Sequence, residues 1–445
     1  MLDSIFNFLK ELDEIFWGYF AFFLIIFLGC IFIFRGGGTL IRSLPETLKI
    51  FFSFLKRGSP ANRGIHPLKA FFASTGGMIG IGNVVGIATA VQMGGPGALV
   101  WVWIAGIIGA IVKYCEIYLG FKYRQPNKEG SYNGGPMYFL KKAFKNRWIP
   151  LVVALLLCIY AIEIYQFSVI TDSVSINWHF NRYAVIMILL LFVLYASIGG
   201  VSRIGQICSW VMPFFIFIYI AMGFWVILQE FRSIPLILLD VFKSAFVGHA
   251  AVGGFAGSTI ILTIQHGIAR AAYSADIGVG YDSIIQSESA TLEPEKQARL
   301  AILGVCLDNL ICTFSILVVL VSGVWKSLTP LEGSQLIQTA LESYFPYMHL
   351  FIPFFFIITG FTTITTYFVV GIKCASYLAP RFGKYVYIVY GITALILFSL
   401  IPQNQALLVM SVSGSILLVI NLLGIFRLRK EIVFEKINHP VEKAA

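Results

Sequence analysis

Two glycine-rich stretches inside long apolar segments are the parts of this sequence best suited to binding a small ligand. The first reads STGGMIGIGN over residues 74–83, and the second reads GGFAGS over residues 253–258. Inside a bilayer, unwound backbone is tolerated only where protein, a polar cavity or a ligand satisfies its N–H and C=O groups. Freed N–H groups at the start of a half-helix suit a carboxylate, and freed carbonyls suit an ammonium group or a sodium ion. A zwitterionic amino acid bound together with a cation would satisfy both.

The composition requires that these stretches sit in a membrane. Of the 445 residues, 58% are hydrophobic and only 12% are charged, which is outside the range of soluble domains. Apolar runs of about 20 residues are long enough to cross a hydrocarbon core as helices, whereas a β-barrel would show short alternating segments. We expect an all-α polytopic protein with about eleven spans, near residues 15–34, 68–92, 97–121, 149–175, 183–198, 206–229, 246–268, 298–324, 348–378, 384–401 and 405–426.

The interrupted spans are the second and the seventh of this set. If the first span is set aside as an addition, they become the first and sixth of ten and occupy matching places in two five-span halves, which is the pattern of an inverted repeat. Glycine in membrane helices also serves close helix packing, but packing alone does not require matching positions. We expect residues 1–45 to hold the extra helix, residues 46–430 to form one transporter domain with repeats at about 66–230 and 244–427, and residues 431–445 to form a tail.

The basic residues predict the orientation of the chain. Lys and Arg gather in the loops at residues 35–69 and 122–147 and in the tail after residue 427, whereas alternate loops are nearly free of them. Because cytoplasmic loops retain the positive excess, the N-terminus should lie outside and the C-terminus inside the cell. We interpret the net charge of +10 as a result of this topology and not as a sign of nucleic-acid binding. A nucleic-acid-binding protein would show a stripe of basic residues with aromatic residues among them, and this sequence has none. Acidic residues before the first span do not fit a cleaved signal peptide.

The sequence shows no motif that would support an enzyme active site or a resident metal site. The seven cysteines lie in or beside apolar spans without zinc-type spacing, and the six histidines are scattered without an i,i+4 pair. No Gly-x-Ser-x-Gly motif is present. A passive channel would favour a continuous pore over two broken helices that meet at mid-membrane. The pattern therefore favours a transporter over an enzyme, a channel or a sensor.

Several motifs resemble the alanine or glycine:cation symporter family, also called the sodium:alanine symporter family. They read GIGNVVGIATA over residues 80–90, GGPGA over 94–98, GGPMY over 134–138, AVGGFAGS over 251–258 and GIAR over 267–270. Their order matches from about residue 15 to residue 426. The resemblance implies a leucine-transporter-like core of ten helices with discontinuous first and sixth helices, plus one added N-terminal helix. It also implies sodium-driven import of a small neutral amino acid, such as alanine or glycine, across the bacterial inner membrane.

The resemblance also implies site residues. Substrate would contact both broken helices, the core's third helix and one aromatic side chain, at Gly80, Ile81, Gly82, Asn83, Gln166, Phe255, Ala256, Gly257 and Tyr367. The coupling ion would be Na⁺, with no other cofactor, and it would be held by Gly80 and by the hydroxyls of Thr362 and Thr363. The alternative for each threonine is a hydrogen bond to its own helix.

This sequence departs from the family pattern at several positions. Ile81 replaces a threonine, Tyr367 a tryptophan and Ser168 an asparagine, and residues 274–278 read SADIG in place of an Asn-Glu-Ala version. Glu163 stands near a usually uncharged position, where it either couples transport through a cation or proton, or lies near the solvent end of its span. Proton-coupled transport of another amino acid or small zwitterion is the alternative function.

Two further charged residues lie one helical turn apart within an expected span. Lys113 and Glu116 are three residues apart on one helical face, so we expect them to pair with each other. Asp308, followed by Asn309 on another span, is expected to serve a packing or hydrogen-bond network.

Overall fold

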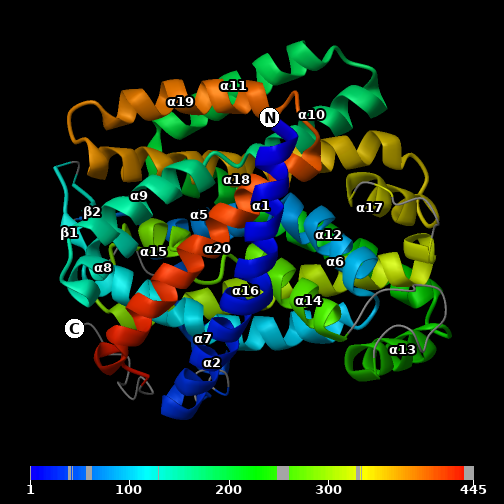
Figure 1. Ribbon diagram of the computed structural model, residues 1–445, viewed down its shortest axis with the longest axis horizontal. Coiled ribbons are helices and arrows are strands. Elements are labelled where there is room, and N and C mark those ends of the chain that lie inside the picture. The colour runs from blue at the N-terminus through cyan, green and yellow to red at the C-terminus, as the bar shows by residue number, and fades with distance from the viewer. Residues whose placement is uncertain are drawn as a thin grey trace.

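The computed structural model describes residues 2–38, 42, 44–56, 63–128, 130–247, 260–326, 331 and 333–434. These residues form helices joined by short turns, and one small hairpin pairs β1 (Gln125–Pro126) with β2 (Tyr132–Asn133) in antiparallel register (Figure 1). The all-helical prediction is therefore confirmed.

Seven helical segments among the described residues are long and apolar enough to cross a membrane, and eight if one bent pair counts as a span. Two of them are the segments Ser4–Gly36 and Trp148–Trp178. The other five are single helices: α7 (Ala98–Lys122), α12 (Gly200–Gln229), α16 (Pro294–Ser322), α18 (Met348–Leu378) and α20 (Gln403–Arg427). Two shorter apolar helices, α11 (Arg182–Ile198) and α19 (Gly383–Phe398), lie where further spans were expected. Outside the expected seventh span, the helices match the predicted spans to within a few residues at most ends.

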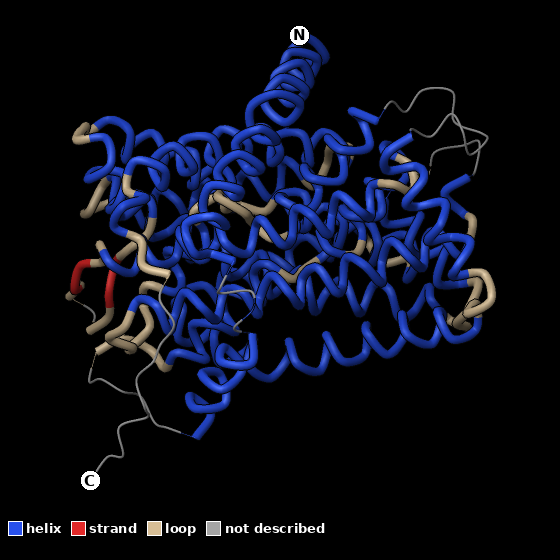
Figure 2. The backbone as a smooth tube through the Cα atoms, turned by 90° about the horizontal axis from the view of Figure 1, so that it is seen from below, coloured by secondary structure: helices blue, strands red, loops and turns tan. Residues whose placement is uncertain are grey.

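The N-terminal segment is one nearly continuous run made of α1 (Leu2–Ile15), η1 (Phe16–Ala21), α2 (Phe22–Phe32) and η2 (Ile33–Gly37). It packs against α20 and α7, and Figure 2 shows its start projecting from the rest of the bundle. Shorter helical segments complete the fold: α4 (Leu44–Lys56), α8 (Pro136–Phe144), α13 (Ile234–Val247), α17 (Gly333–Glu342) and the 3₁₀ turns η5 (Val324–Lys326) and η6 (Arg429–Glu431). In Figure 1, α8 and the hairpin lie at the end opposite α13 and α17.

The first predicted break is present at the expected residues. Helix α5 (Pro67–Met78) stops, and the chain passes through η3 (Ile81–Asn83) into α6 (Val85–Gly94) with a bend of 53°. Gly80 has extended backbone angles. A side chain there would place its Cβ 2.7 Å from Oε1 of Gln166, so close approach explains the glycine.

Among the described residues, a second break is present farther along the chain than the stretch where one was predicted. Residues 253–258 are outside the described residues, but α14 runs over Ile260–Ser274, beyond the predicted end at residue 268, and α15 follows over Tyr281–Gln286. Residues 275–280 between them are not helical, and Asp276, Gly278 and Gly280 have positive φ. Helix α14 packs against α6 and α7, and α15 packs against α7 and α5. The two halves of α5–α6 thus each face one half of α14–α15.

The longer α14 also includes a charged residue. Arg270 lies beyond the predicted end of the seventh span at residue 268, but it belongs to α14, which packs against other helices of the bundle.

A third break was not predicted. The expected span at residues 149–175 is divided into α9 (Trp148–Tyr160) and α10 (Ile164–Trp178), and Glu163 at the junction adopts the left-handed conformation, with φ 56°. A non-glycine residue rarely takes this conformation without tertiary support. The acidic side chain therefore stands at a break in mid-span.

Candidate functional site

The three breaks meet at one small cavity. The cavity has room for about one water molecule, about 10 Å³. Its lining comes from α5, η3, α9, α10, α14, α18 and the second break, and consists of Gly77, Met78, Gly82, Tyr160, Glu163, Gln166, Tyr273, Ser274, Asp276 and Tyr367. Any amino acid is larger than one water molecule, so binding here requires these walls to move apart.

Asn83 holds the first break together. Its Oδ1 accepts a hydrogen bond from the Gly80 N–H at 2.9 Å, and its amide nitrogen donates to Asp308 on α16. The Oγ of Ser274, at the end of α14, donates to the same Asp308 oxygen at 2.8 Å. Asp308 therefore serves a network, as expected, that links the first break, α14 and α16. Ile81 donates its N–H to Oε1 of Gln166 at 3.2 Å.

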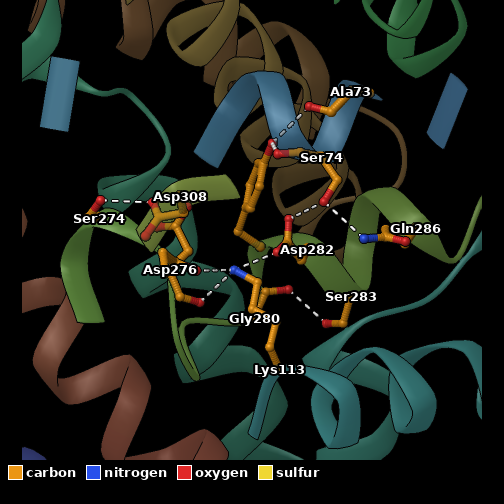
Figure 3. A network of polar contacts seen from close by, with 12 residues as sticks. Ala73, Ser74, Lys113, Ser274, Asp276, Gly280, Asp282, Ser283, Gln286 and Asp308 are labelled. Carbon is orange, nitrogen blue, oxygen red and sulfur yellow. Dashed lines mark hydrogen bonds and ion pairs between the residues drawn. The ribbon is translucent and has the colours of Figure 1, made fainter. Parts of the chain in front are cut away.

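The second break is held by a buried lysine from α7 (Figure 3). The Lys113 ammonium donates to the carbonyls of Ala275 and Asp276, the latter at 3.1 Å, and pairs with Asp282 of α15 at 2.5 Å. The other oxygen of Asp282 accepts from Ser74 of α5 at 2.5 Å. The predicted pair of Lys113 with its neighbour one turn away is therefore wrong, because the ammonium reaches across to the second break instead.

Tyrosines form one wall of the site. Tyr367 stacks on Tyr281 with ring centroids 4.0 Å apart, and Tyr160 packs edge-on to Tyr367 at 5.7 Å. The Tyr160 hydroxyl donates to the Asp276 carboxylate at 3.1 Å. Tyr367 thus lines the cavity, where the resemblance placed an aromatic substrate contact.

Glu163 also faces this cavity and is only 2% exposed, which favours the first of its two alternatives over a position near the solvent end of its span. Its Oε2 accepts a hydrogen bond from Nε2 of Gln166 at 3.1 Å. Glu163 and Asp276 bring two carboxyl groups to the same cavity, and both take the left-handed conformation at a break.

The two threonines proposed to bind the cation differ in their contacts. Both hydroxyls donate to the Thr359 carbonyl of their own helix, Thr362 at 2.8 Å and Thr363 at 3.2 Å. Thr363 also reaches the Gly76 carbonyl of α5 at 3.3 Å. Only Thr363 therefore connects α18 to the first broken helix, while Thr362 contacts the sulfur of Met212.

Three predicted residues, Phe255, Ala256 and Gly257, lie outside the described residues. Sequence reasoning missed Tyr273, Ser274, Asp276 and Asp282 as parts of the site. Gly278 and Gly280 carried a signal, because they repeat the spacing of Gly80 and Gly82 just beyond α14.

Comparison with known proteins gives a consistent picture. The sequence model of the sodium:alanine symporter family matches residues 2–443. An uncharacterized transporter of Haemophilus influenzae is 30% identical over 97% of both chains. The sodium/alanine symporter AgcS of Methanococcus maripaludis is 28% identical, covering 83% of each chain.

Among solved structures, MhsT in complex with L-phenylalanine matches with a TM-score of 0.54 and 14% identity, covering 80% of this chain and 89% of MhsT. A manganese transporter of Eremococcus coleocola matches with a TM-score of 0.51 and 12% identity, covering 79% and 74%. At these identities the likeness concerns the fold alone. The family match over nearly the whole chain shows that this protein belongs to the sodium:alanine symporter family of membrane transporters.

Proposed function

We propose that this chain imports a small neutral amino acid, such as alanine or glycine, together with Na⁺ across the cytoplasmic membrane. The observation that carries the proposal is that two unwound stretches, residues 79–83 and 275–280, approach one buried polar cavity. Backbone freed from helices at mid-span needs partners, and a zwitterion with a cation supplies them. AgcS, a relative, is named a sodium/alanine symporter, and AlsT of Bacillus subtilis, 28% identical, is named an amino-acid carrier protein.

The substrate would lie between the two breaks. Its carboxylate would accept hydrogen bonds from the N–H groups of Ile81 and Gly82, where η3 and α6 begin and the helix dipole favours negative charge. Its ammonium group would face Asp276 and Ser274 at the second break. The tyrosine wall and the close packing of the lining favour a small side chain over a large one.

The sodium ion would bind where α18 meets the first broken helix. The Thr363 hydroxyl and the Gly76 carbonyl lie 3.3 Å apart, so both oxygens can turn to one cation. Thr362 and the backbone of Gly80 complete the proposed set of oxygen ligands. A cation here would stabilise the carboxylate of the substrate nearby, and each ligand would raise the affinity for the other.

We further propose the complete architecture of the family core for this chain. It comprises eleven spans, with an inverted repeat of residues 66–230 and 244–427 and with α5–α6 and α14–α15 as its paired broken helices. The N-terminus would lie outside and the tail at residues 431–445 inside. Contacts among the basic regions support one common cytoplasmic face, since Lys122 pairs with Glu431 at 3.0 Å and Arg299 with Glu46 at 3.4 Å.

A second candidate is proton-coupled transport of a different amino acid or small zwitterion. The observation that favours it is Glu163, a buried carboxyl group in mid-span that lines the cavity.

Uptake into proteoliposomes separates these functions. Radiolabelled L-alanine, D-alanine, glycine and larger neutral amino acids would be offered with an inward gradient of Na⁺, of H⁺, or of neither. We expect accumulation of a small amino acid that requires the Na⁺ gradient, and we expect Thr363→Val to weaken this Na⁺-driven accumulation more than Thr362→Val. Accumulation driven by H⁺ alone would establish the second candidate, and no accumulation of any amino acid would refute both.

A further inference from the structure

The amide of Gln166 bridges the first break and the carboxyl group of Glu163. Its oxygen accepts the Ile81 N–H at 3.2 Å, and its nitrogen donates to Glu163 Oε2 at 3.1 Å. Gln166 is 5% exposed, and both of these contacts are buried. A primary amide has an acceptor end and a donor end that cannot be exchanged without rotating the group. The contacts of Gln166 at the two ends are therefore coupled.

A substrate carboxylate at the first break would change what the amide must do. The Ile81 N–H would turn from the Gln166 oxygen to the carboxylate. The Gln166 oxygen would then meet a carboxylate oxygen, and two acceptors facing each other without a proton are unfavourable in a buried site. Rotation of the amide brings its NH₂ group to the substrate, but it leaves the amide oxygen facing Glu163.

The contact between Glu163 and the amide oxygen of the rotated Gln166 is favourable only if Glu163 is protonated. An ionised Glu163 has acceptors only, whereas the acid form has an O–H that can donate to the amide oxygen of Gln166. Closing the cavity around the substrate also removes water from Glu163, which disfavours its ionised form in the membrane. When the site opens, water can again hydrate the carboxylate.

We propose that Glu163 takes up one proton when the substrate carboxylate binds at Ile81, with Gln166 as the group that transmits the change. This rests on the proposed function, which places an amino-acid carboxylate at the first break. The proton comes from water on the side to which the site is open and converts Glu163 from COO⁻ to COOH. It returns to water on the other side when the substrate leaves. One proton thus crosses with each amino acid in addition to the sodium ion.

The other titratable groups around Glu163 come from five neighbouring parts of the fold: Tyr160 of α9, Tyr273 of α14, Asp276 of the second break, Tyr367 of α18 and Tyr387 of α19. Tyrosine hydroxyls keep their protons over the range in which transport operates. Asp276 is the competing carboxyl group. It accepts from Tyr160, and its carbonyl accepts from Lys113. The Gln166 amide makes its hydrogen bond to Glu163, so the amide links substrate binding to that carboxyl group.

The test is binding of tritiated L-alanine to the purified full-length protein in saturating Na⁺ from pH 5.5 to 8.5. We expect affinity to fall towards about tenfold per pH unit at the alkaline end, the limit for one linked proton. A pH-sensitive dye in weak buffer should report about one proton taken up per alanine bound.

Glu163→Gln carries a permanent NH₂ donor for the Gln166 oxygen, so it should bind alanine with an affinity that does not change with pH and without proton uptake. Asp172→Asn, which removes a carboxyl group farther along α10, should keep the wild-type slope.

Each other result is decisive. Alanine binding that is independent of pH in the wild type, or that takes up no proton, overturns the inference and leaves sodium-coupled import intact. A slope that persists in Glu163→Gln and disappears in Asp276→Asn assigns the proton to Asp276 and also overturns it. Absence of L-alanine binding at every pH refutes alanine import and the inference with it. If Glu163→Gln does not fold, the wild-type proton count decides alone.

Discussion

Replacing Lys113 tests whether the second break is held as the structure indicates. The ammonium is fully buried and pairs with Asp282 at 2.5 Å while donating to two carbonyls of residues 275–276. Lys113→Met removes the charge and keeps much of the side-chain volume. Asp282 would then be a buried carboxylate whose remaining partner in this network is the Ser74 hydroxyl. Removal of one partner from a buried ion pair typically costs about 3–5 kcal/mol.

The assay is a double-mutant cycle on the free energy of unfolding in mixed micelles. Asp282→Leu should also be strongly destabilising, because it leaves the Lys113 charge buried. The double variant Lys113→Met/Asp282→Leu has no buried charge, so it should be more stable than the sum of the single losses by about 2–3 kcal/mol. Lys142→Met, at an exposed position on α8, is the control and should change stability by less than about 0.5 kcal/mol. Additive effects in the cycle, or a loss below about 1 kcal/mol for Lys113→Met, would refute the pairing.

Two further predictions concern the first break and the loop that follows α15. Gly80→Ala should abolish amino-acid uptake, since its Cβ would clash with Gln166, whereas Gly86→Ala on α6 meets nothing within 4 Å and should transport normally; equal activity of the two variants would contradict the geometry. Glu288→Gln removes the ion pair with Lys373 that ties the buried loop at residues 287–291 to α18, so hydrogen exchange of that loop should become faster by about tenfold. Exchange at the wild-type rate would show that the pair does not hold the loop.

The sequence was informative where local residue type decides the structure. The glycines at residues 76–82 placed the first break, and hydropathy placed most helix ends to within a few residues. The predicted spans leave residues 269–297 outside the membrane, and Arg270, Asp276 and Asp282 lower the hydropathy there. Asp276 and Asp282 are buried in the bundle, and Asp282 pairs with Lys113, which no local pattern reveals.

The break at Glu163 shows the other limit of sequence reasoning. No glycine or proline marks residues 161–163, and the left-handed conformation of Glu163 is imposed by the surrounding helices rather than by its own preference. The sequence identified the residue as a misplaced charge in an apolar span. Only the fold places it against Gln166 and opposite Asp276.

The central claim is that the substrate binds between the breaks at residues 79–83 and 275–280. An experimental structure with L-alanine and Na⁺ bound tests it most directly. We expect the alanine carboxylate within hydrogen-bond distance of the Ile81 and Gly82 N–H groups, and its ammonium group beside Asp276. Alanine bound against residues 253–258, away from Asp276, would contradict the account.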